Sequence, residues 1–362
     1  MGRLPTGVHN AITDVAGVRV GHTTLVFGEG PLHPGRGPVR TGVTVVLPHG
    51  DNLFLHKVRA AVHTINGFGK VCGFEQVREL GTIEAPVALT NTLNVGLVAD
   101  ALVQHAVCCN PAIGIGIGSV NVVVGETNDG YLNDLQGRHV RAEHVWAAIE
   151  GASSGPVSEG AVGAGTGTTC FGWKGGIGTA SRILPEEAGG FTVGTLVQSN
   201  FGRPEALRID AVPIGRHIRP PLSQEQPSRE GGSIMTVLAT DAPLTSRQLR
   251  RLCVRAVGGL ARTGSTFDHG SGDFVIAFST GWRIEHEPDS MIATRPVLDN
   301  EPKAMVWLLP AVAECVEEAV LNSLFVAETV VGRDGHTRHA LPVDEVTALL
   351  RRVGVAEETG QT

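Results

Sequence analysis

The chain has 362 residues, and 29 lysines and arginines against 36 acidic residues give a formal charge of −7. This balance, with only 4% aromatic residues, argues against nucleic-acid binding, while 42% hydrophobic residues are enough for a large core. Because no apolar stretch is long enough to span a bilayer and the first residues lack the apolar region of a signal peptide, we expect a soluble cytoplasmic protein without membrane contact.

Apolar runs rich in β-branched residues recur in the first third of the chain and predict strands. These runs cover residues 18–26, 39–47, 86–90 and 120–124. The spacing of apolar residues predicts one helix over residues 93–107, with Asn94 as a candidate cap, and another over residues 143–150 that ends at Gly151.

Glycine is the unusual component, with 48 residues, and it is densest between residues 151 and 181. The glycines of segments 114–118 and 163–167 do not have the spacing of a dinucleotide-binding motif, and the sequence around Lys174 does not match a P-loop. We interpret these segments as structural glycine loops. Residues 151–155 match the G-x-S-x-G pattern of a nucleophile elbow. That motif requires a strand before the serine, but here a helix precedes it, so we expect an ordinary loop.

The second half of the chain contains a polar, proline-rich segment at residues 214–232, which we interpret as an exposed linker. We expect strands at residues 191–198, 233–240 and 273–280. We expect a helix from Thr245 to about Arg262, with Thr245 and Gln248 as a capping box. Two further helices are expected, one at 311–328 with Pro310 as its first residue and one at 342–353 that ends at Gly354. Strands combined with long helices predict an α+β fold in which helices cover sheets.

The six cysteines and 14 histidines show no metal-binding or disulfide pattern. No two cysteines have CxxC spacing, so we expect free thiols. The closest histidines, His336 and His339, lack the glutamate of a zinc motif and lie beside turn residues, so we expect them on the surface. We therefore expect neither a metal nor a cofactor.

The junction between the linker and the next strand, Gly232-Ser233, allows two interpretations. On local pattern alone it is an ordinary start of a strand. In the functional alternative, the Ser233 hydroxyl attacks the carbonyl of Gly232, because glycine has no side chain to obstruct the approach. An N-to-O acyl shift and hydrolysis then free the Ser233 amine. That amine has an ordinary pKa of roughly 8, so nucleophile and base would belong to one residue.

A second motif, Gly270-Ser271-Gly272-Asp273, opens the following strand. If the two strands are neighbours, their N-terminal ends lie side by side. Ser271 and Asp273 are two residues apart on extended backbone, so their side chains point the same way. A relay from Ser233 through Ser271 to Asp273 is then available. The alternative is a plain turn into a strand.

With these motifs, the chain resembles the P1-type β-aminopeptidases and L-aminopeptidase/D-esterases (the DmpA/BapA family) along nearly its full length. The matching stretches are residues 10–24, 40–44, 80–84, 125–134, 163–182, 197–202, 232–233 with 239–243, and 270–273. The resemblance implies a single αββα sandwich that cleaves itself into an α-chain of residues 1–232 and a β-chain of residues 233–362. It also implies tetramers of such heterodimers, without metal or organic cofactor.

The resemblance also implies the reaction and the residues that perform it. Family members are hydrolases that release N-terminal residues from small peptides, amides or esters; some prefer β-residues, others small L-residues or D-residue amides and esters. Ser233 matches the nucleophile, Ser271 and Asp273 the supporting relay, and Asn200 the oxyanion donor. At least one member has a glutamate at the acid position, where this chain has the shorter Asp273.

Two further residues are expected to bind substrate. Glu126 matches the carboxylate that holds the substrate ammonium group, and Tyr131, in the same segment, is expected to line the pocket. Without the resemblance, the local sequence predicts a solvated loop charge for Glu126 and a turn at a strand end for Asn200.

Two other functions remain open at this point. An acyltransferase like the ornithine acetyltransferases shares this architecture, but its nucleophile is a threonine, whereas Ser233 follows Gly232 here. An unprocessed binding or scaffold protein of the same fold would remain one intact chain.

Overall fold

Two β-sheets form the centre of the computed structural model, which describes residues 2–221 and 232–355. The first sheet contains β1 (Arg19–Phe27), β2 (Val39–Leu47), β5 (Val87–Asn91) and β6 (Val123–Thr127). The second contains β3 (His56–Gly67), β4 (Thr82–Ile83), β9 (Gly176–Ile183), β10 (Thr192–Asn200), β11 (Ser233–Thr240) and β12 (Gly272–Glu285). The helices are α1 (Phe74–Leu80), α2 (Val95–Cys109), α3 (Ala142–Glu150), α4 (Ser246–Thr263), α5 (Glu301–Phe325) and α6 (Val343–Arg352).

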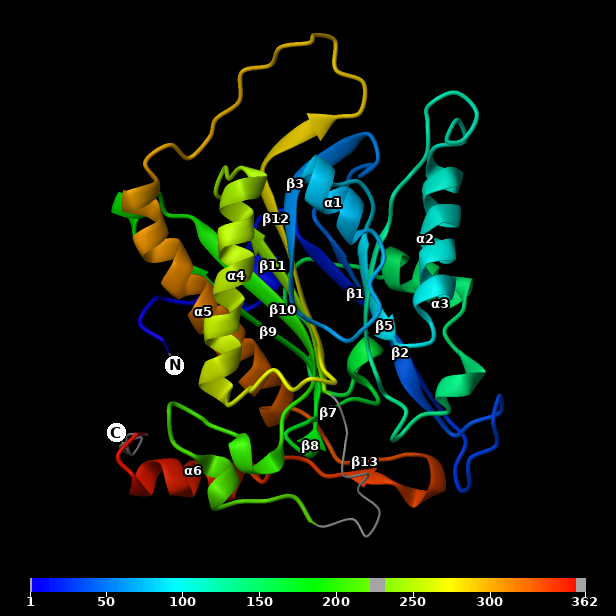
Figure 1. The fold of residues 1–362 in the computed structure, drawn as a ribbon, viewed down its shortest axis with the longest axis vertical. Coiled ribbons are helices and arrows are strands. Elements are labelled where there is room, and N and C mark those ends of the chain that lie inside the picture. Colours follow the sequence, from blue (N-terminus) through cyan, green and yellow to red (C-terminus); the bar gives the residue numbers. More distant parts are fainter. Residues whose placement is uncertain (1, 222–231, 356–362) are drawn as a thin grey trace.

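The sheets lie between two pairs of helices, so the molecule has four layers (Figure 1). The strand orders are β1-β2-β5-β6 and β4-β3-β12-β11-β10-β9. Helices α2 and α3 cover the first sheet, and α4 and α5 cover the second. Two short ribbons complete the structure: β7 (Thr169–Cys170) with β8 (Trp173–Lys174), and β13 (Val330–Val331) with β14 (Thr337–Arg338). The α+β fold predicted from the sequence and the αββα arrangement implied by the family resemblance are both confirmed.

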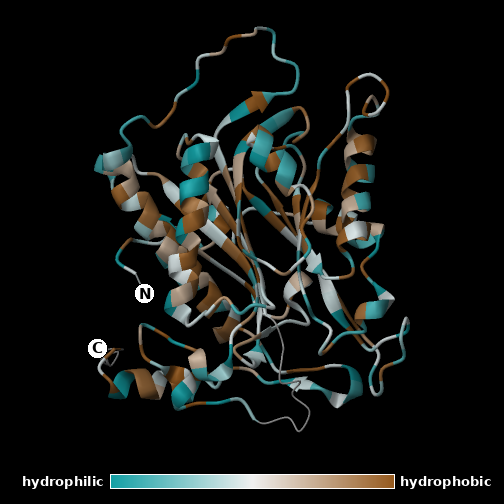
Figure 2. Cartoon of the chain, in the orientation of Figure 1, coloured by the Kyte–Doolittle hydropathy of each residue, from teal (hydrophilic) through white to brown (hydrophobic). Residues whose placement is uncertain are grey.

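Three hydrophobic cores alternate with the four layers. The core between the sheets includes Val46, Val62, Leu89, Leu196, Val237 and Ile276. The two outer cores lie between each sheet and its helices. Because both faces of each sheet are covered, β2 and β11 are buried along nearly their whole length rather than at alternate residues. Figure 2 shows hydrophobic residues gathered in these strands and in the helices beside them. Among the described helices, none combines the length and the hydropathy needed to cross a bilayer.

Local signals placed helix α4 correctly. The Thr245 side chain accepts a hydrogen bond from the Gln248 N–H at 3.3 Å, and the Gln248 side chain accepts one from the Thr245 N–H at 2.8 Å. The predicted capping box is therefore confirmed. In α2, Asn94 occupies the cap position, but its side chain donates to the carbonyl of Val140 instead.

Helix α5 begins ten residues earlier than the prediction of a helix at 311–328, and Pro310 lies inside it. Asn300 caps its true start by accepting a hydrogen bond from the Lys303 N–H at 3.2 Å. Proline removes one helical hydrogen bond. The helix continues through Pro310 because residues on both sides of it are buried against the core under α4.

Strand β9, which forms an edge of the larger sheet, was not predicted from the sequence. A Cβ atom on Gly178 would lie 1.9 Å from the carbonyl oxygen of Ala319 in α5, and one on Gly176 would lie 2.1 Å from that of Gly160. Glycine is therefore required here by close backbone approach, not by a turn. Strand β3 was also missed, because charged residues such as Lys57 and Arg59 interrupt its apolar pattern.

The prediction of an exposed linker at residues 214–232 needs correction. Residues Ile214–Arg216 form a short 3-10 turn, and Ile214 is fully buried in the core beneath α4 and α5. Pro220 is buried as well. Residues 222–231 lie outside the described part of the chain.

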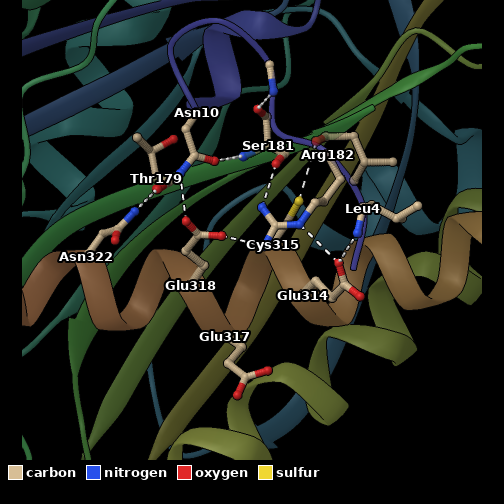
Figure 3. A network of polar contacts seen from close by, with 12 residues as sticks. Leu4, Asn10, Thr179, Ser181, Arg182, Glu314, Cys315, Glu317, Glu318 and Asn322 are labelled. Carbon is tan, nitrogen blue, oxygen red and sulfur yellow. Dashed lines mark hydrogen bonds and ion pairs between the residues drawn. The ribbon is translucent and has the colours of Figure 1, made fainter. Parts of the chain in front are cut away.

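A buried ionic cluster joins β9 to α5 and to the N-terminal segment (Figure 3). Arg182 is fully buried and forms ion pairs with Glu314 and Glu318 of α5. The Leu4 N–H donates to Glu314 at 3.2 Å, and the Asn10 side chain donates to Glu318 at 2.7 Å. The cluster thus fixes the first residues of the chain to the outer helix layer.

Candidate active site

Ser233 is the first residue of β11 and lies at one end of the larger sheet. It pairs with Asn200 on the antiparallel strand β10 and with Gly272 on the parallel strand β12. The N-terminal ends of β11 and β12 therefore lie side by side, as predicted. The Ser233 side chain is buried, with 5% of the residue exposed.

The Asn200 carboxamide faces the Ser233 hydroxyl. Asn200 Nδ2 donates to Ser233 Oγ at 3.2 Å, while Asn200 Oδ1 accepts a hydrogen bond from the Thr169 N–H at 2.9 Å. Because a carboxamide has a donor end and an acceptor end, the Thr169 N–H determines which end faces the serine. An N–H donor beside a hydroxyl nucleophile is what stabilisation of an oxyanion requires.

The peptide group before Ser233 is held on both sides. The Gly232 carbonyl oxygen accepts a hydrogen bond from the Gly272 N–H at 3.1 Å. A Cβ atom on Gly232 would lie 2.8 Å from Cα and Cβ of Phe201, closer than real contacts allow. Glycine is therefore needed at this position because the end of β10 passes so near.

Ser271 and Asp273 form the second part of the site. The Ser271 hydroxyl donates to Asp273 Oδ1 at 2.6 Å, so the two side chains share one side of the strand as predicted. The Asn66 side chain donates to the carbonyls of Asp268 at 2.8 Å and Ser271 at 2.7 Å, which fixes the turn before β12. In the described chain the Ser271 hydroxyl bonds to Asp273 and not to Ser233, so a relay from Ser271 to Ser233 stays a prediction.

The Asp273 carboxyl group is perturbed by its surroundings. Burial raises its pKa to about 6; the Ser271 hydrogen bond opposes the rise, and the charge of Asp268 adds to it. Its Oδ2 atom is buried without a hydrogen-bond partner among the described residues. The carboxyl group therefore changes its charge in a pH range where enzymes commonly work.

Glu126, in β6, lies near the same end of the larger sheet. A Cβ atom on Gly69 would lie 3.2 Å from both Glu126 Oε1 and Gly272 Cα. Glu126 is only 3% exposed, which contradicts a solvated loop charge. Its carboxylate accepts hydrogen bonds from the Lys70 N–H and the Thr92 hydroxyl, and it makes no ion pair within the described residues. It can therefore accept a cationic group.

Tyr131 is not brought against Ser233 by any described contact. Its ring stacks on His336 with centroids 4.4 Å apart, and the Arg338 guanidinium lies 3.5 Å from its centroid. His336 also donates a hydrogen bond to the Tyr131 carbonyl at 2.8 Å. The expectation that His336 and His339 lie on the surface is wrong in part, because both are half-buried.

Two important residues were missed from the sequence. Thr169 acts through its backbone, which no side-chain motif reveals. Lys174 is fully buried, and its ammonium group donates to the carbonyls of Gly165 at 2.8 Å and Gly175 at 2.6 Å. One signal was present: Lys174 is the only charged residue between positions 160 and 181.

Solved structures define the class of this protein. The L-aminopeptidase D-Ala-esterase/amidase from Ochrobactrum anthropi, described as a serine aminopeptidase with a variant of the Ntn hydrolase fold, is 38% identical with a TM-score of 0.88. A Burkholderia beta-aminopeptidase is 40% identical with a TM-score of 0.89; each covers 99% of this chain and 98% of its own. The PH0078 protein of Pyrococcus horikoshii OT3 is 49% identical with a TM-score of 0.91, covering 98% of both chains. The fold is thus this variant of the N-terminal nucleophile (Ntn) hydrolase fold.

The sequence comparisons give the family. The profile of Peptidase family S58 matches residues 10–338. The beta-peptidyl aminopeptidase BapA of Sphingosinicella microcystinivorans is 40% identical over 359 residues, which cover 96% of this chain and 89% of that protein. The chain belongs to peptidase family S58 and is a serine aminopeptidase of the Ntn hydrolase type.

Proposed function

We propose that this aminopeptidase activates itself by cleaving the bond between Gly232 and Ser233, and that Ser233 then serves as its N-terminal nucleophile. The proposal rests on two hydrogen bonds beside this peptide bond. The Asn200 amide lies 3.2 Å from the Ser233 hydroxyl, and the Gly272 N–H binds the Gly232 carbonyl oxygen at 3.1 Å. A hydroxyl and N–H donors around one peptide group are the components that acyl transfer needs.

In self-cleavage, Ser233 Oγ forms a bond to the Gly232 carbonyl carbon, and the bond from that carbon to the Ser233 nitrogen breaks. The hydroxyl proton ends on the released nitrogen, giving an ester. Water hydrolyses the ester and leaves a carboxylate on Gly232 and a free amine on Ser233. The Gly272 N–H supports this step by polarising the carbonyl group. The products are an α-chain of residues 1–232 and a β-chain of residues 233–362.

In turnover, the same hydroxyl attacks the carbonyl group that follows the substrate's N-terminal residue. The Ser233 amine accepts the hydroxyl proton with the help of Ser271 and Asp273, and returns it to the leaving group. Asn200 Nδ2 donates to the negative oxygen of the tetrahedral intermediate. The resulting acyl-enzyme is resolved by water.

The buried Glu126 carboxylate supports an aminopeptidase role, because it lies near the nucleophile without an ion-pair partner among the described residues. An ammonium group on the substrate supplies that partner. The names of the relatives support N-terminal β-residues, L-residues and D-alanine esters or amides as the substrate classes. Tyr131 remains proposed as a residue of the pocket wall.

We also propose that the cleaved chains assemble into a tetramer of heterodimers. The loop between β12 and α5 projects from the molecule (Figure 1), and Met291 and Ile292 within it are 102% and 84% exposed. Apolar side chains in such a position favour association. Light scattering on the purified protein tests the assembly.

A cytoplasmic location is supported by the six free cysteines, which suit a reducing compartment.

A panel of p-nitroanilides tests the activity. Wild-type protein should release nitroaniline from at least one of the β-alanine, L-alanine, glycine and D-alanine derivatives. Ser233→Ala should release none, since it lacks the nucleophile. Equal activity in the variant would contradict the proposed role of Ser233.

A further inference from the structure

Lys174 is a buried cation that the proposed reaction does not use. It is fully buried, and within the described chain it forms no ion pair. Burial lowers its pKa to about 7, although electrostatic interactions with Cys170 and Asp129 oppose this. Burying an amine is unfavourable unless hydrogen bonds compensate. Here its two bonds go to the carbonyls of Gly165 and Gly175.

These two carbonyls belong to the backbone that presents Thr169. The Gly165 carbonyl also accepts from the Thr168 hydroxyl at 3.0 Å, and the Gly175 N–H donates to the Thr168 carbonyl at 3.1 Å. Thr169 then pairs with Lys174 across the ribbon of β7 and β8. Lys174 thus bonds to the backbone on both sides of Thr169.

The glycine segment has little freedom to adjust if this clamp is lost. A Cβ atom on Gly165 would lie 2.4 Å from the Ile177 N atom, and one on Gly175 would lie 2.6 Å from the Ser199 carbonyl oxygen. Both glycines therefore pack directly against neighbouring backbone. Without the Lys174 amine the Gly175 carbonyl loses its hydrogen bond, and because the packed glycines cannot absorb a shift, the shift would be transmitted along the backbone to Thr169.

We propose that Lys174 is a positioning residue for the Asn200 carboxamide, a role that rests on the proposed function of Ser233. The Lys174 amine fixes the backbone of the glycine segment, which fixes the Thr169 N–H. That N–H binds Asn200 Oδ1 and so keeps Asn200 Nδ2 toward the Ser233 hydroxyl. Lys174 contacts neither substrate nor nucleophile in this role.

A double-mutant cycle on the rate of self-cleavage tests the proposal. Wild type, Lys174→Met, Asn200→Ala and the double variant are made by cell-free synthesis, and the appearance of the two fragments is followed over time. We expect Lys174→Met to slow cleavage at least roughly tenfold, since a misplaced oxyanion donor loses part of its effect. The double variant should be no slower than Asn200→Ala alone. Lys303→Met, at an exposed lysine of α5, is the control and should cleave at the wild-type rate.

Several results would overturn the role of Lys174. One is an unchanged cleavage rate in Lys174→Met. Another is a double variant slowed by the product of both single effects, which indicates a loss of stability independent of Asn200. If Lys174→Met does not fold, Thr168→Val removes the other side-chain bond to the Gly165 carbonyl; non-additivity with Asn200→Ala supports the proposal and additivity overturns it. A wild-type chain that neither cleaves nor hydrolyses amides would refute the proposed function itself.

Discussion

The Asp273 carboxyl group has the most direct influence on the Ser271 hydroxyl, because it accepts that hydroxyl's hydrogen bond at 2.6 Å. In the uncleaved chain the Ser233 nitrogen is an amide and does not titrate. Asp273, whose pKa burial raises to about 6, is therefore the group near the nucleophile expected to set the pH dependence of self-cleavage.

Self-cleavage should slow as the pH falls below about 6, because protonated Asp273 can no longer take up a proton from Ser271. Rates of fragment formation between pH 4.5 and 8 measure this. The Asp273→Asn variant should cleave itself more slowly at pH 8, and its rate should not fall further as the pH drops below about 6. If the same fall in rate persists in this variant, another group is responsible for the titration.

The same carboxyl group should lower stability at neutral pH. Its pKa is higher in the folded state than the ordinary value of 3.8, so its favourable contribution is complete below about pH 4 and is lost as the pH rises through about 6. Asp273→Asn should therefore increase the free energy of unfolding by about 2 kcal/mol at pH 8, and by much less at pH 4. Urea unfolding of the uncleaved Ser233→Ala protein, with and without Asp273→Asn, measures the difference at the two pH values; a less stable Asp273→Asn protein at pH 8 contradicts it.

Glu126→Gln should raise KM for amino-acyl p-nitroanilides roughly 10- to 100-fold, because a charged hydrogen bond to the ammonium group is lost. The kcat value should change less. An ester substrate without the amino group is the control and should be hydrolysed equally by both proteins. A KM that stays constant for amino-acyl substrates would remove Glu126 from substrate binding.

At the scale of single elements, the accuracy of the sequence predictions follows how local each signal is. Helix α4 carries its cap, its apolar face and its terminal glycine within its own residues, so it was placed within one residue. The start of α5 depended on whether tertiary packing tolerates Pro310. Strand β9 could not be predicted because its glycines are required by close contacts with Ala319 and Gly160, which are distant in sequence.

The Arg182 cluster is an element-scale contact with a large expected effect on stability (Figure 3). Arg182→Ala would leave Glu314 and Glu318 without their buried cation, which should cost about 3–5 kcal/mol. Arg78→Ala, which breaks an exposed pair with Glu75, is the matched control and should cost less than about 1 kcal/mol. Equal effects in thermal unfolding would show that the cluster does not anchor β9 to α5.

At the scale of the whole molecule, the candidate site combines groups from both sides of the cleavage point. Asn200 and Glu126 precede Gly232, whereas Ser233, Ser271 and Asp273 follow it. Ser233, Ser271 and Asp273 lie in short motifs that suggested their roles, whereas Asn200 and Glu126 were assigned only through the family resemblance. The orientation of Asn200 could not be predicted, because it depends on the Thr169 backbone and on the folding of the glycine segment.

The two fragments should remain together after cleavage. Strand β11 pairs with β10 over eight residues, and β12 pairs with β3, so fragments from both sides of the cut share one sheet. Gel filtration without denaturant should give one species containing both fragments. Dissociation of the fragments in native buffer would contradict the continuous sheet.

Mass spectrometry with N-terminal sequencing of the purified protein tests the central proposal most directly. The account predicts two polypeptides, one ending at Gly232 and one beginning at Ser233, whose masses together exceed that of the intact chain by one water. The Ser233→Ala protein should stay intact. A wild-type protein that remains a single uncut chain while hydrolysing amides, or one cut at another bond, would contradict the account.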